Sequence, residues 1–438
     1  MRTRILTVLF IMLLLVACSS DKTLEEQSEK IIDDLIAGEF ENVRNNYFSQ
    51  DLQETFSKEE LQASWEEKIV DKDVEVEFES SEQQAFHVIE GIVEQTDSSI
   101  KVRMTWNNEE ELVGFHIEPS QTKTALPSNV EEETITIGEG TDFELDGTLA
   151  LPTDHDEVIP GVILVHGSGP SDQDETVYEY APFRDLAYGL AEQGIAVLRY
   201  PKRSFVYPEK VNTFGNDLTV NEETIDDAVL AAQLLKEDNR IQTDSVFVVG
   251  HSLGGMLAPR IDLQANTAGM VILAGSPRPL WEIIYDQNIY FLDMLVNDEE
   301  EKMEMIQMLV EEKKVGAALI DMTDEEAKET DVFTINGYYL KEMEEHDVSE
   351  IALNSNKPML LLQGEADFQV TMEQDFTMWQ ELLKEKSNAT FKSYKELNHF
   401  FITSEGSNKG TVEEYSIPGH VDEQVIEDIG RWIQEQAN

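Results

Sequence analysis

One serine in this sequence has the neighbours of a catalytic nucleophile. Ser252 lies in the run GHSLGG over 250–255, directly after the apolar stretch SVFVV over 245–249 and before a further apolar run, MLA. This order predicts a buried strand, a sharp turn and a helix, which together present a serine hydroxyl on a strained backbone. We expect Gly250 and Gly254 to be required sterically, because side chains there would collide with the turn or the neighbouring strand. The pattern favours nucleophilic catalysis by Ser252.

Acyl transfer at Ser252 would also need backbone N–H donors directed at the developing oxyanion. One expected donor is the N–H of Leu253, the residue after the serine. The second is expected in the loop after the apolar stretch GVILV over 161–165, where the sequence continues HGSGP. We predict that the backbone N–H of Ser168 is this donor, with the adjoining glycines permitting close approach.

A serine nucleophile also needs a base, and a carboxylate that orients the base. Asp367 follows the expected strand PMLLLQ over 358–363, and Glu365 is a competing carboxylate nearer the turn glycine. Six of the eight histidines precede Asp367, which leaves His399 and His420 as candidate bases. We predict Asp367 as the acid and His399 as the base, because His399 lies just beyond an expected strand whereas His420 leads into the last helix.

The net charge and the spacing of the histidines limit which macromolecules, metals and cofactors the protein is expected to bind. The formal net charge is −57, from 89 acidic and 32 basic residues spread along the chain. Such a surface repels nucleic acid and anionic lipid head groups, so neither is an expected partner. The histidines show no HExxH or similar ligand spacing, and we therefore expect no metal and no cofactor.

The N-terminus has the features of a bacterial lipoprotein signal. Arg2 and Arg4 precede an apolar run over 5–16, which is too short for an ordinary spanning helix. The run ends in LVAC, and Cys18 is the single cysteine of the chain. The segment 1–18 resembles a signal peptide with a lipobox, which implies lipidation of Cys18 and attachment to the outer face of the cell membrane. The alternative is an ordinary secretory signal with an incidental cysteine.

The rest of the chain divides into two patterns. Residues 23–118 predict a small α+β domain: helices to about 70, then strands over 85–93, 100–106 and 112–117. A segment rich in proline and polar residues, 119–130, predicts a linker. From 131 onward, a hairpin (134–137 and 143–151) precedes strands that alternate with helices, which predicts a doubly wound, mostly parallel sheet. The expected strands are 161–165, 195–200, 245–249, 269–273, 358–363 and 390–394, with helices over 183–191 and 226–235.

The alternation of strands and helices stops at about 278–350. This stretch is charged and helical in composition and contains six of the fourteen methionines. We interpret it as a helical cap inserted before the strand that bears Asp367. Methionine adapts to irregular apolar surfaces, so the methionines are candidates for lining an acyl pocket, although ordinary helix packing is the commoner use.

The order Ser252, Asp367, His399 and the runs around these residues resemble the α/β-hydrolase superfamily over 131–438. The runs that carry the resemblance are HGSGP, GHSLGG, QGEAD and NHF. The nearest likeness is to bacterial dienelactone hydrolases and serine aminopeptidases. Residues 23–118 are similar in layout to a small domain, with a nuclear-transport-factor-like sheet, that often precedes secreted members. One departure is RYPKRS over 199–204, where relatives often have RYDKRG.

The resemblance implies a serine hydrolase with the α/β-hydrolase fold, and the lipoprotein-like N-terminus implies that it is membrane-anchored and extracytoplasmic. The predicted activity is that of a carboxylesterase on small or medium acyl esters, through the triad and an acyl-enzyme. Two alternatives remain open at this point. The same triad could cleave a peptide or transfer an acyl group to an acceptor other than water, since the fold leaves the substrate open. A non-catalytic binding lipoprotein is the other, which a missing triad member would favour; none is missing.

Overall fold

The structure is a computed structural model that describes residues 24–69, 74–83, 86–95, 99–107, 111–120, 124–153, 157–296 and 298–437. The chain divides into two compact units, Met1–Lys123 with Ser416–Pro418, and Thr124–Tyr415 with Gly419–Asn438. The predicted signal segment and Cys18 lie outside the described residues. Within the described ranges, no helix is long and apolar enough to cross a membrane.

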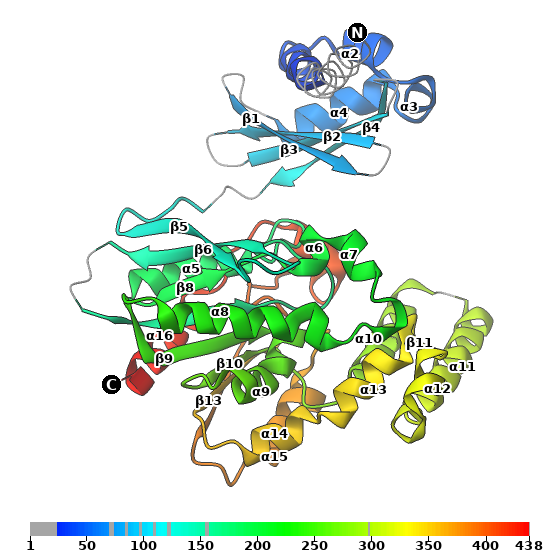
Figure 1. Cartoon of the computed structure of the whole chain (residues 1–438). Helices are drawn as coiled ribbons and strands as arrows, with labels where there is room; N and C mark the ends of the chain where they lie inside the picture. The colour runs from blue at the N-terminus through cyan, green and yellow to red at the C-terminus, as the bar shows by residue number, and fades with distance from the viewer. Residues whose placement is uncertain are drawn as a thin grey trace, which may run out of the picture. The chain divides into compact units, whose positions relative to one another are not determined.

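The first unit is a four-stranded antiparallel sheet with helices on one face, in the strand order β1-β2-β3-β4 (Figure 1). Alternate residues of β3, such as Val102 and Met104, are buried in one apolar cluster with Ile31 and Leu35 of the first helix. The helices are 24–36, α2 (Phe40–Tyr47), α3 (Gln50–Thr55) and α4 (Lys58–Lys68). The strands are β1 (Glu75–Gln83), β2 (Phe86–Glu94), β3 (Ser99–Asn107) and β4 (Leu112–Ser120).

Two features of this region differ from what the sequence suggested. Strand β1 was not predicted, because its glutamates and serines mask the alternating Val76 and Phe78 that pack against the core. The predicted linker over 119–130 is strand at both ends, since β4 continues through Pro119 to Ser120 and the second unit's first strand begins at Val130. Proline is tolerated there because β4 is an edge strand.

The second unit is built on an eight-stranded sheet with the order β14-β13-β10-β9-β7-β8-β6-β5. The six strands from β14 to β8 are parallel, and the hairpin β5–β6 adds two antiparallel strands at one edge. The predicted mostly parallel, doubly wound sheet is confirmed. The strands are β5 (Val130–Ile137), β6 (Leu145–Pro152), β7 (Ile159–Val165), β8 (Ala196–Arg199), β9 (Ile241–His251), β10 (Met270–Leu273), β13 (Met359–Gly364) and β14 (Ala389–Tyr394).

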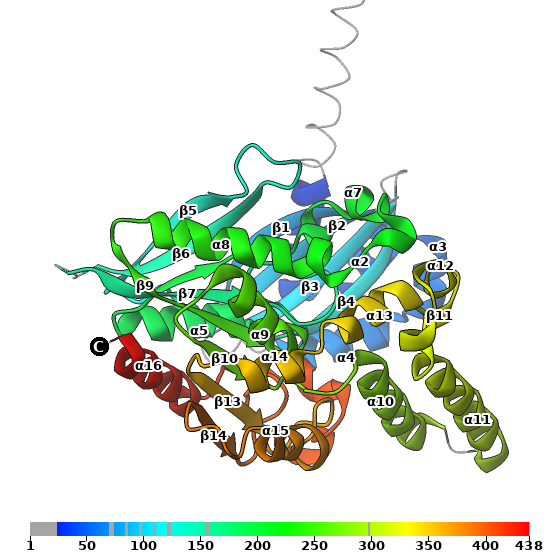
Figure 2. The same cartoon turned by 60° about the horizontal axis from the view of Figure 1, so that its bottom comes forward.

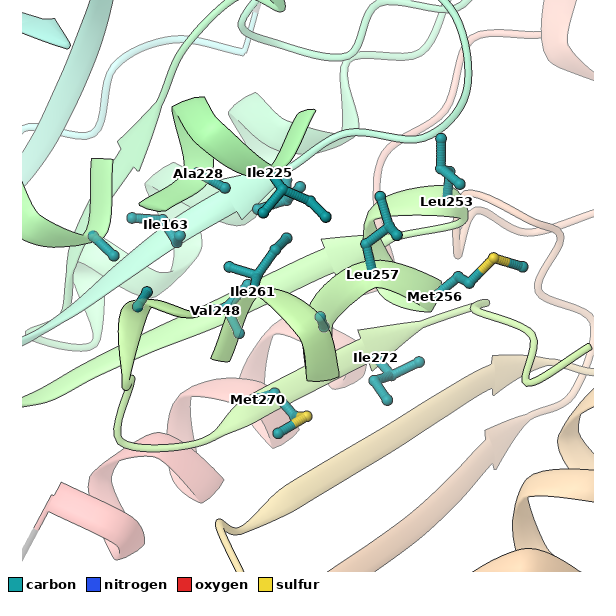
Figure 3. Close-up of a cluster of buried hydrophobic side chains, with 14 of the residues drawn as sticks. Ile163, Ile225, Ala228, Val248, Leu253, Met256, Leu257, Ile261, Met270 and Ile272 are labelled. Atoms are coloured by element: carbon teal, nitrogen blue, oxygen red, sulfur yellow. The ribbon is translucent and has the colours of Figure 1, made fainter. Parts of the chain in front are cut away.

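Helices cover both faces of this sheet, because successive residues of each central strand point to opposite sides. Val162 and Leu164 of β7 join the apolar cluster that includes α5 and α16, whereas Ile163 and Val165 join the cluster that includes α8 and α9. Figure 3 shows Leu257 and Ile261 of α9 and Ala228 of α8 beside residues of the sheet. The helices are α5 (Pro182–Glu192), α8 (Asp226–Glu237), α9 (Leu253–Ala265), α15 (Thr377–Leu382) and α16 (Glu423–Ala437), with the short α6 (Arg203–Val206) and α7 (Pro208–Asn212) after β8.

A helical insertion separates β10 from β13. Helices α10 and α11 lie side by side, and Figure 2 shows them at one end of the unit. The insertion consists of α10 (Leu280–Leu295), α11 (Glu299–Gly316), α12 (Asp324–Lys328), the two-residue strands β11 (Asp331–Val332) and β12 (Ile335–Asn336), α13 (Gly337–Glu345) and α14 (Val348–Asn354). It occupies the stretch in which the sequence predicts a cap.

Candidate active site

Ser252 forms the turn between strand β9 and helix α9. Its backbone has φ 52° and ψ −115°, a conformation that costs a non-glycine residue about 1–3 kcal/mol. The Ser252 N–H donates to the Leu273 carbonyl of β10 at 2.8 Å, and the Ser252 carbonyl accepts from the Met256 N–H at 2.9 Å. The turn is therefore tied to the sheet on one side and to the helix on the other, which holds the strained serine in place.

The two glycines that flank the serine are required by close backbone contacts. A Cβ atom on Gly250 would lie 2.1 Å from the Gly254 carbonyl oxygen. A Cβ atom on Gly254 would lie 2.1 Å from the Val165 carbonyl oxygen and 2.7 Å from that of His166. The steric prediction for both glycines is confirmed. The second contact also shows that helix α9 begins directly against the end of β7, where the HGSGP loop starts.

The predicted acid and base are hydrogen-bonded to each other. His399 Nδ1 lies 2.8 Å from Asp367 Oδ2, and both side chains are buried. Asp367 Oδ2 also accepts from Gln363 Nε2 at 2.9 Å, and Oδ1 accepts from the backbone N–H groups of Gln369 and Val370 at 2.8 and 3.0 Å. With every neighbour a donor, the carboxylate favours the His399 tautomer that carries its proton on Nδ1 and leaves Nε2 free to accept one.

Glu365 and His420, the alternative candidates for the acid and the base, lie away from the Ser252 cavity. Glu365 is exposed and accepts a hydrogen bond from the Ser393 hydroxyl at 2.8 Å. His420 pairs with Asp185 at 3.2 Å, and its side chain is 53% exposed. Neither residue lines the cavity that contains Ser252. Of the pairs that the sequence left open, the structure joins Asp367 with His399, and their catalytic roles stay predictions.

Ser252 and His399 line one cavity of about 290 Å³. The cavity is bounded on one side by the HGSGP loop and on another by the insertion, through Leu280, Ile283 and Ile284 of α10. Its wall is mostly apolar near the insertion and polar near the loop. The insertion therefore acts as a cap, and its first helix forms part of the pocket that would receive a substrate.

The predicted oxyanion donors lie around this cavity. Leu253 is the first residue of α9, so its N–H is among the helix N–H groups that have no partner within the helix. In the loop after β7, the Gly167 N–H is already engaged, because it donates to Glu175 Oε1 at 2.7 Å. The next N–H belongs to Ser168, which is exposed at the cavity wall. A Cβ on Gly167 would lie 3.2 Å from the Ser252 Cβ, so this loop reaches the nucleophile.

Comparison with known proteins assigns the chain to a family. Residues 162–404, more than half of the chain, match the family described as the alpha/beta hydrolase family. The esterase EstD of Thermotoga maritima is 37% identical over 338 residues, which cover 76% of this chain and 76% of that protein. The chain belongs to the alpha/beta hydrolase family. The predictions of this fold and of a hydrolase enzyme are thereby confirmed.

Other matches concern the first unit and the fold. Residues 28–115 match a family described as a protein of unknown function (DUF3887). Among solved structures, Est1E from Butyrivibrio proteoclasticus is 16% identical, with a TM-score of 0.43, over 69% of this chain and 98% of its own. The Pyrococcus furiosus esterase Pf2001 is 15% identical, with a TM-score of 0.44, over 73% of this chain and 97% of its own.

Three buried charged or titratable residues at this alpha/beta hydrolase site were not predicted. Lys202 Nζ donates to the Gly167 carbonyl at 3.1 Å and to Glu223 Oε1 at 2.7 Å. Glu175 Oε2 lies 3.0 Å from Nδ1 of His251, the residue before the nucleophile. Lys202 and His251 stand within the runs RYPKRS and GHSLGG, but Glu175 carries no local signal, because its contacts exist only once the loop closes over the sheet.

The Lys202 contact bears on the predicted oxyanion donor. The carbonyl of Gly167 and the N–H of Ser168 belong to one peptide group, and in a trans peptide they point in opposite directions. By holding the carbonyl, the buried Lys202 ammonium sets the direction of the Ser168 N–H. The RYPKRS loop thus supports the HGSGP loop despite its departure from RYDKRG.

His166 opens the HGSGP loop in a neutral form. Burial is the largest influence and lowers the pKa of His166 to about 4. Its Nε2 lies 2.8 Å from the Asp172 carbonyl, an oxygen that can only accept, so Nε2 carries the proton. The ring packs on Phe183 and Tyr200. His166 therefore anchors the loop by packing and one hydrogen bond.

The idea that the cap methionines line the acyl pocket is not supported. The methionine on the cavity wall is Met256 of α9, whereas the cap contributes leucine, isoleucine and Gln287. Met303 and Met308 of α11 are exposed, and Met343 is buried in the core. In the described residues, no group of three or more His, Cys, Asp or Glu side chains is placed to hold a metal ion.

Proposed function

We propose that the protein is a carboxylesterase that cleaves small or medium acyl esters through Ser252, His399 and Asp367. The observation that carries the proposal is the buried His399–Asp367 pair on the same cavity as a serine held in a strained turn. The 37% identical relative bears the name of an esterase, which supports an ester as the substrate class.

The mechanism follows from the tautomer that Asp367 imposes. His399 Nε2 accepts the Ser252 hydroxyl proton as Oγ attacks the ester carbonyl, and the resulting imidazolium is stabilised by the Asp367 carboxylate. The N–H groups of Leu253 and Ser168 bind the oxyanion. His399 then gives the proton to the leaving alcohol oxygen as the carbonyl–oxygen bond breaks. Water, deprotonated by His399, releases the acid and restores the serine.

The cavity supports a limit on acyl length. Its volume of about 290 Å³ lies at the lower end of ligand pockets, which run from about 300 to 1,000 Å³. Leu280, Ile283 and Ile284 of the cap would contact the acyl chain, and the amide of Gln287 on the same helix donates to the Gln369 carbonyl at 3.2 Å. A short apolar acyl group matches this wall better than a peptide.

The test is hydrolysis of p-nitrophenyl esters of graded acyl length by the purified protein, with Ser252→Ala as the paired variant. We expect turnover of short and medium esters, and a loss of about 10⁴ to 10⁶ in kcat in Ser252→Ala. A fluorophosphonate should label the wild type and leave the variant unlabelled. Near-normal turnover by the variant would refute the assignment of the nucleophile.

We also propose that the protein is anchored by lipid at Cys18 on the extracytoplasmic face of the cell membrane. The support is the LVAC run after a short apolar segment with two preceding arginines. Cys18→Ser should release the protein into the medium or leave an uncleaved precursor, as seen by fractionation and the mass of the product. Processing and membrane retention equal to those of the wild type would contradict the anchor.

A further inference from the structure

A buried charged pair connects the two loops that must meet at the active site. Glu175 belongs to the loop after β7, and His251 is the last residue of β9; they are 4% exposed each. Glu175 Oε1 accepts from the Gly167 N–H at 2.7 Å, and Oε2 lies 3.0 Å from His251 Nδ1. His251 Nε2 lies 3.0 Å from the backbone carbonyl of His399. One chain of contacts thus runs from the HGSGP loop (the predicted oxyanion loop) to the loop that carries His399, the predicted base.

The protons in this chain of contacts are set by the partners. The His399 carbonyl can only accept, so His251 Nε2 carries a proton. Within the described residues, His251 Nδ1 and Glu175 Oε2 have no aligned hydrogen-bond partner, so their 3.0 Å ion pair is what compensates both buried atoms. Burial is the largest influence on His251 and opposes its charge, but Glu175, the His399 carbonyl and Asp367 together raise the pKa of His251 above its usual value. Loss of either partner would leave the other uncompensated in the interior.

We propose that Glu175 is a positioning residue, which fixes the oxyanion loop and the His399 loop relative to each other through its two oxygens. The two oxygens hold different groups. Oε1 holds the Gly167 N–H, whereas Oε2 holds His251 and, through it, the His399 backbone. This inference rests on the proposed function, because it assigns Glu175 to the geometry of that same reaction.

The location of these contacts distinguishes positioning from general stabilisation. Gly167 adjoins Ser168, the predicted oxyanion donor, and it lies against Ser252. The carbonyl that His251 holds belongs to the base itself. Glu175 and His251 also line the cavity, but its apolar wall of Leu280, Ile283 and Ile284 belongs to the cap. A shift at either end of the chain of contacts would misplace a group that acts in the transition state, and is therefore expected to lower kcat more than it changes KM.

The experiment compares Glu175→Ala with Glu175→Gln on a short p-nitrophenyl ester. Glutamine can keep every contact: its oxygen accepts from Gly167 N–H, and its amide donates to Nδ1 of a neutral His251, whose Nε2–H still reaches His399. Alanine keeps none. We expect kcat to fall by about 10² to 10³ in Glu175→Ala, comparable to loss of one oxyanion donor, with KM within about threefold. Glu175→Gln should stay within about tenfold of the wild type.

The matched control is Glu342→Ala, which removes a carboxylate from the buried pair with Arg260 in the same unit, away from this cavity. It should lower the melting temperature and keep kcat within about twofold. Should Glu175→Ala fail to fold, His251→Phe replaces it, because phenylalanine keeps an aromatic ring and removes the donor to His399. His251→Phe is then expected to lose at least about tenfold in kcat.

Several results would overturn the proposal. The first is a kcat for folded Glu175→Ala within threefold of the wild type, and the second is a loss of kcat in Glu175→Ala no larger than that in Glu342→Ala. If Glu175→Ala does not fold, full kcat in His251→Phe would overturn the proposal. A loss in Glu175→Gln equal to that in Glu175→Ala would also overturn it. Failure of the proposed function is separate and is recognised by wild-type protein that hydrolyses no ester faster than Ser252→Ala.

Discussion

Replacement of Asp367 by asparagine gives the sharpest test of the site, because the structure fixes how the amide must sit. Asp367 Oδ1 accepts from two backbone N–H groups, those of Gln369 and Val370, at 2.8 and 3.0 Å. Oδ2 also faces two donors, Gln363 Nε2 and His399 Nδ1, but His399 can present a lone pair by changing tautomer, whereas a backbone N–H cannot. The asparagine oxygen is therefore expected to take the place of Oδ1. The amide NH₂ is then directed at His399 Nδ1, which lies 2.8 Å from Oδ2 in the wild type.

That orientation forces the wrong histidine tautomer. Facing an NH₂ donor, His399 Nδ1 must present its lone pair, so the single ring proton moves to Nε2. A protonated Nε2 can no longer accept the hydroxyl proton of Ser252. The variant also loses the carboxylate charge that stabilises the imidazolium. We expect kcat to fall on the order of 10⁴, which corresponds to about 5 kcal/mol of lost transition-state stabilisation.

The assay is kcat and KM for a short p-nitrophenyl ester at constant folded protein, verified by circular dichroism. Glu365→Gln is the matched control: the same chemical change, two residues away, on an exposed carboxylate that contacts Ser393. It should keep kcat within about twofold. The reasoning is refuted if folded Asp367→Asn retains more than a tenth of wild-type kcat, or if Glu365→Gln loses as much.

Three further outcomes are expected. Gly254→Ala should destabilise the second unit by about 3 kcal/mol or more, seen in denaturant unfolding, because its Cβ would lie 2.1 Å from the Val165 carbonyl oxygen. Ile283→Trp should fill part of the cavity and lower kcat/KM about tenfold for a long-chain ester while sparing an acetate ester; equal losses on both would show that Ile283 does not contact the acyl chain. The hydrogen bond to Asp185 raises the pKa of His420, so its stabilisation should be complete below an unfolded pKa of about 6.5 and lost as pH rises through the folded pKa. The difference in melting temperature between wild type and His420→Gln should therefore shrink with rising pH, and a growing difference would contradict the assignment.

The sheet of the second unit was predictable because its central strands are buried on both faces. Runs such as GVILV and PMLLLQ have no competing helical pattern, and the observed β7 and β13 agree with the predicted strands to within about two residues. Strand β9 starts at Ile241, earlier than predicted; the prediction missed its start because residues 242–244 are polar and partly or fully exposed, while its end is fully buried. Strand β1 was missed for the same reason in a stronger form: glutamate and serine dominate its composition.

The residues of the candidate site were predictable to the extent that each stands next to a motif. Ser252, Asp367 and His399 follow strands, and the carboxyl ends of parallel strands gather at one edge of the sheet. Glu175 follows no strand directly, and no motif in the sequence marks the partners of its side chain. Its contacts with Gly167 and His251 result from a loop that folds back over the sheet, in which Glu175 itself has a positive φ of 53°. Sequence spacing does not encode such a contact.

The loop over 199–204 keeps its supporting contacts although its sequence departs from RYDKRG. Arg203 pairs with Asp227 of α8 at 2.6 and 2.7 Å, and the backbone N–H of Lys202 donates to the Ser171 carbonyl at 2.9 Å. Neither contact depends on the two residues that differ. Lys202 donates a hydrogen bond to the Gly167 carbonyl, and Glu175 accepts one from the Gly167 N–H. Two buried side chains of opposite charge therefore hydrogen-bond to the backbone of one glycine. Both peptide groups of that glycine are thereby held in place, so the Ser168 N–H, if it is the oxyanion donor we predict, would need no reorganisation when negative charge develops.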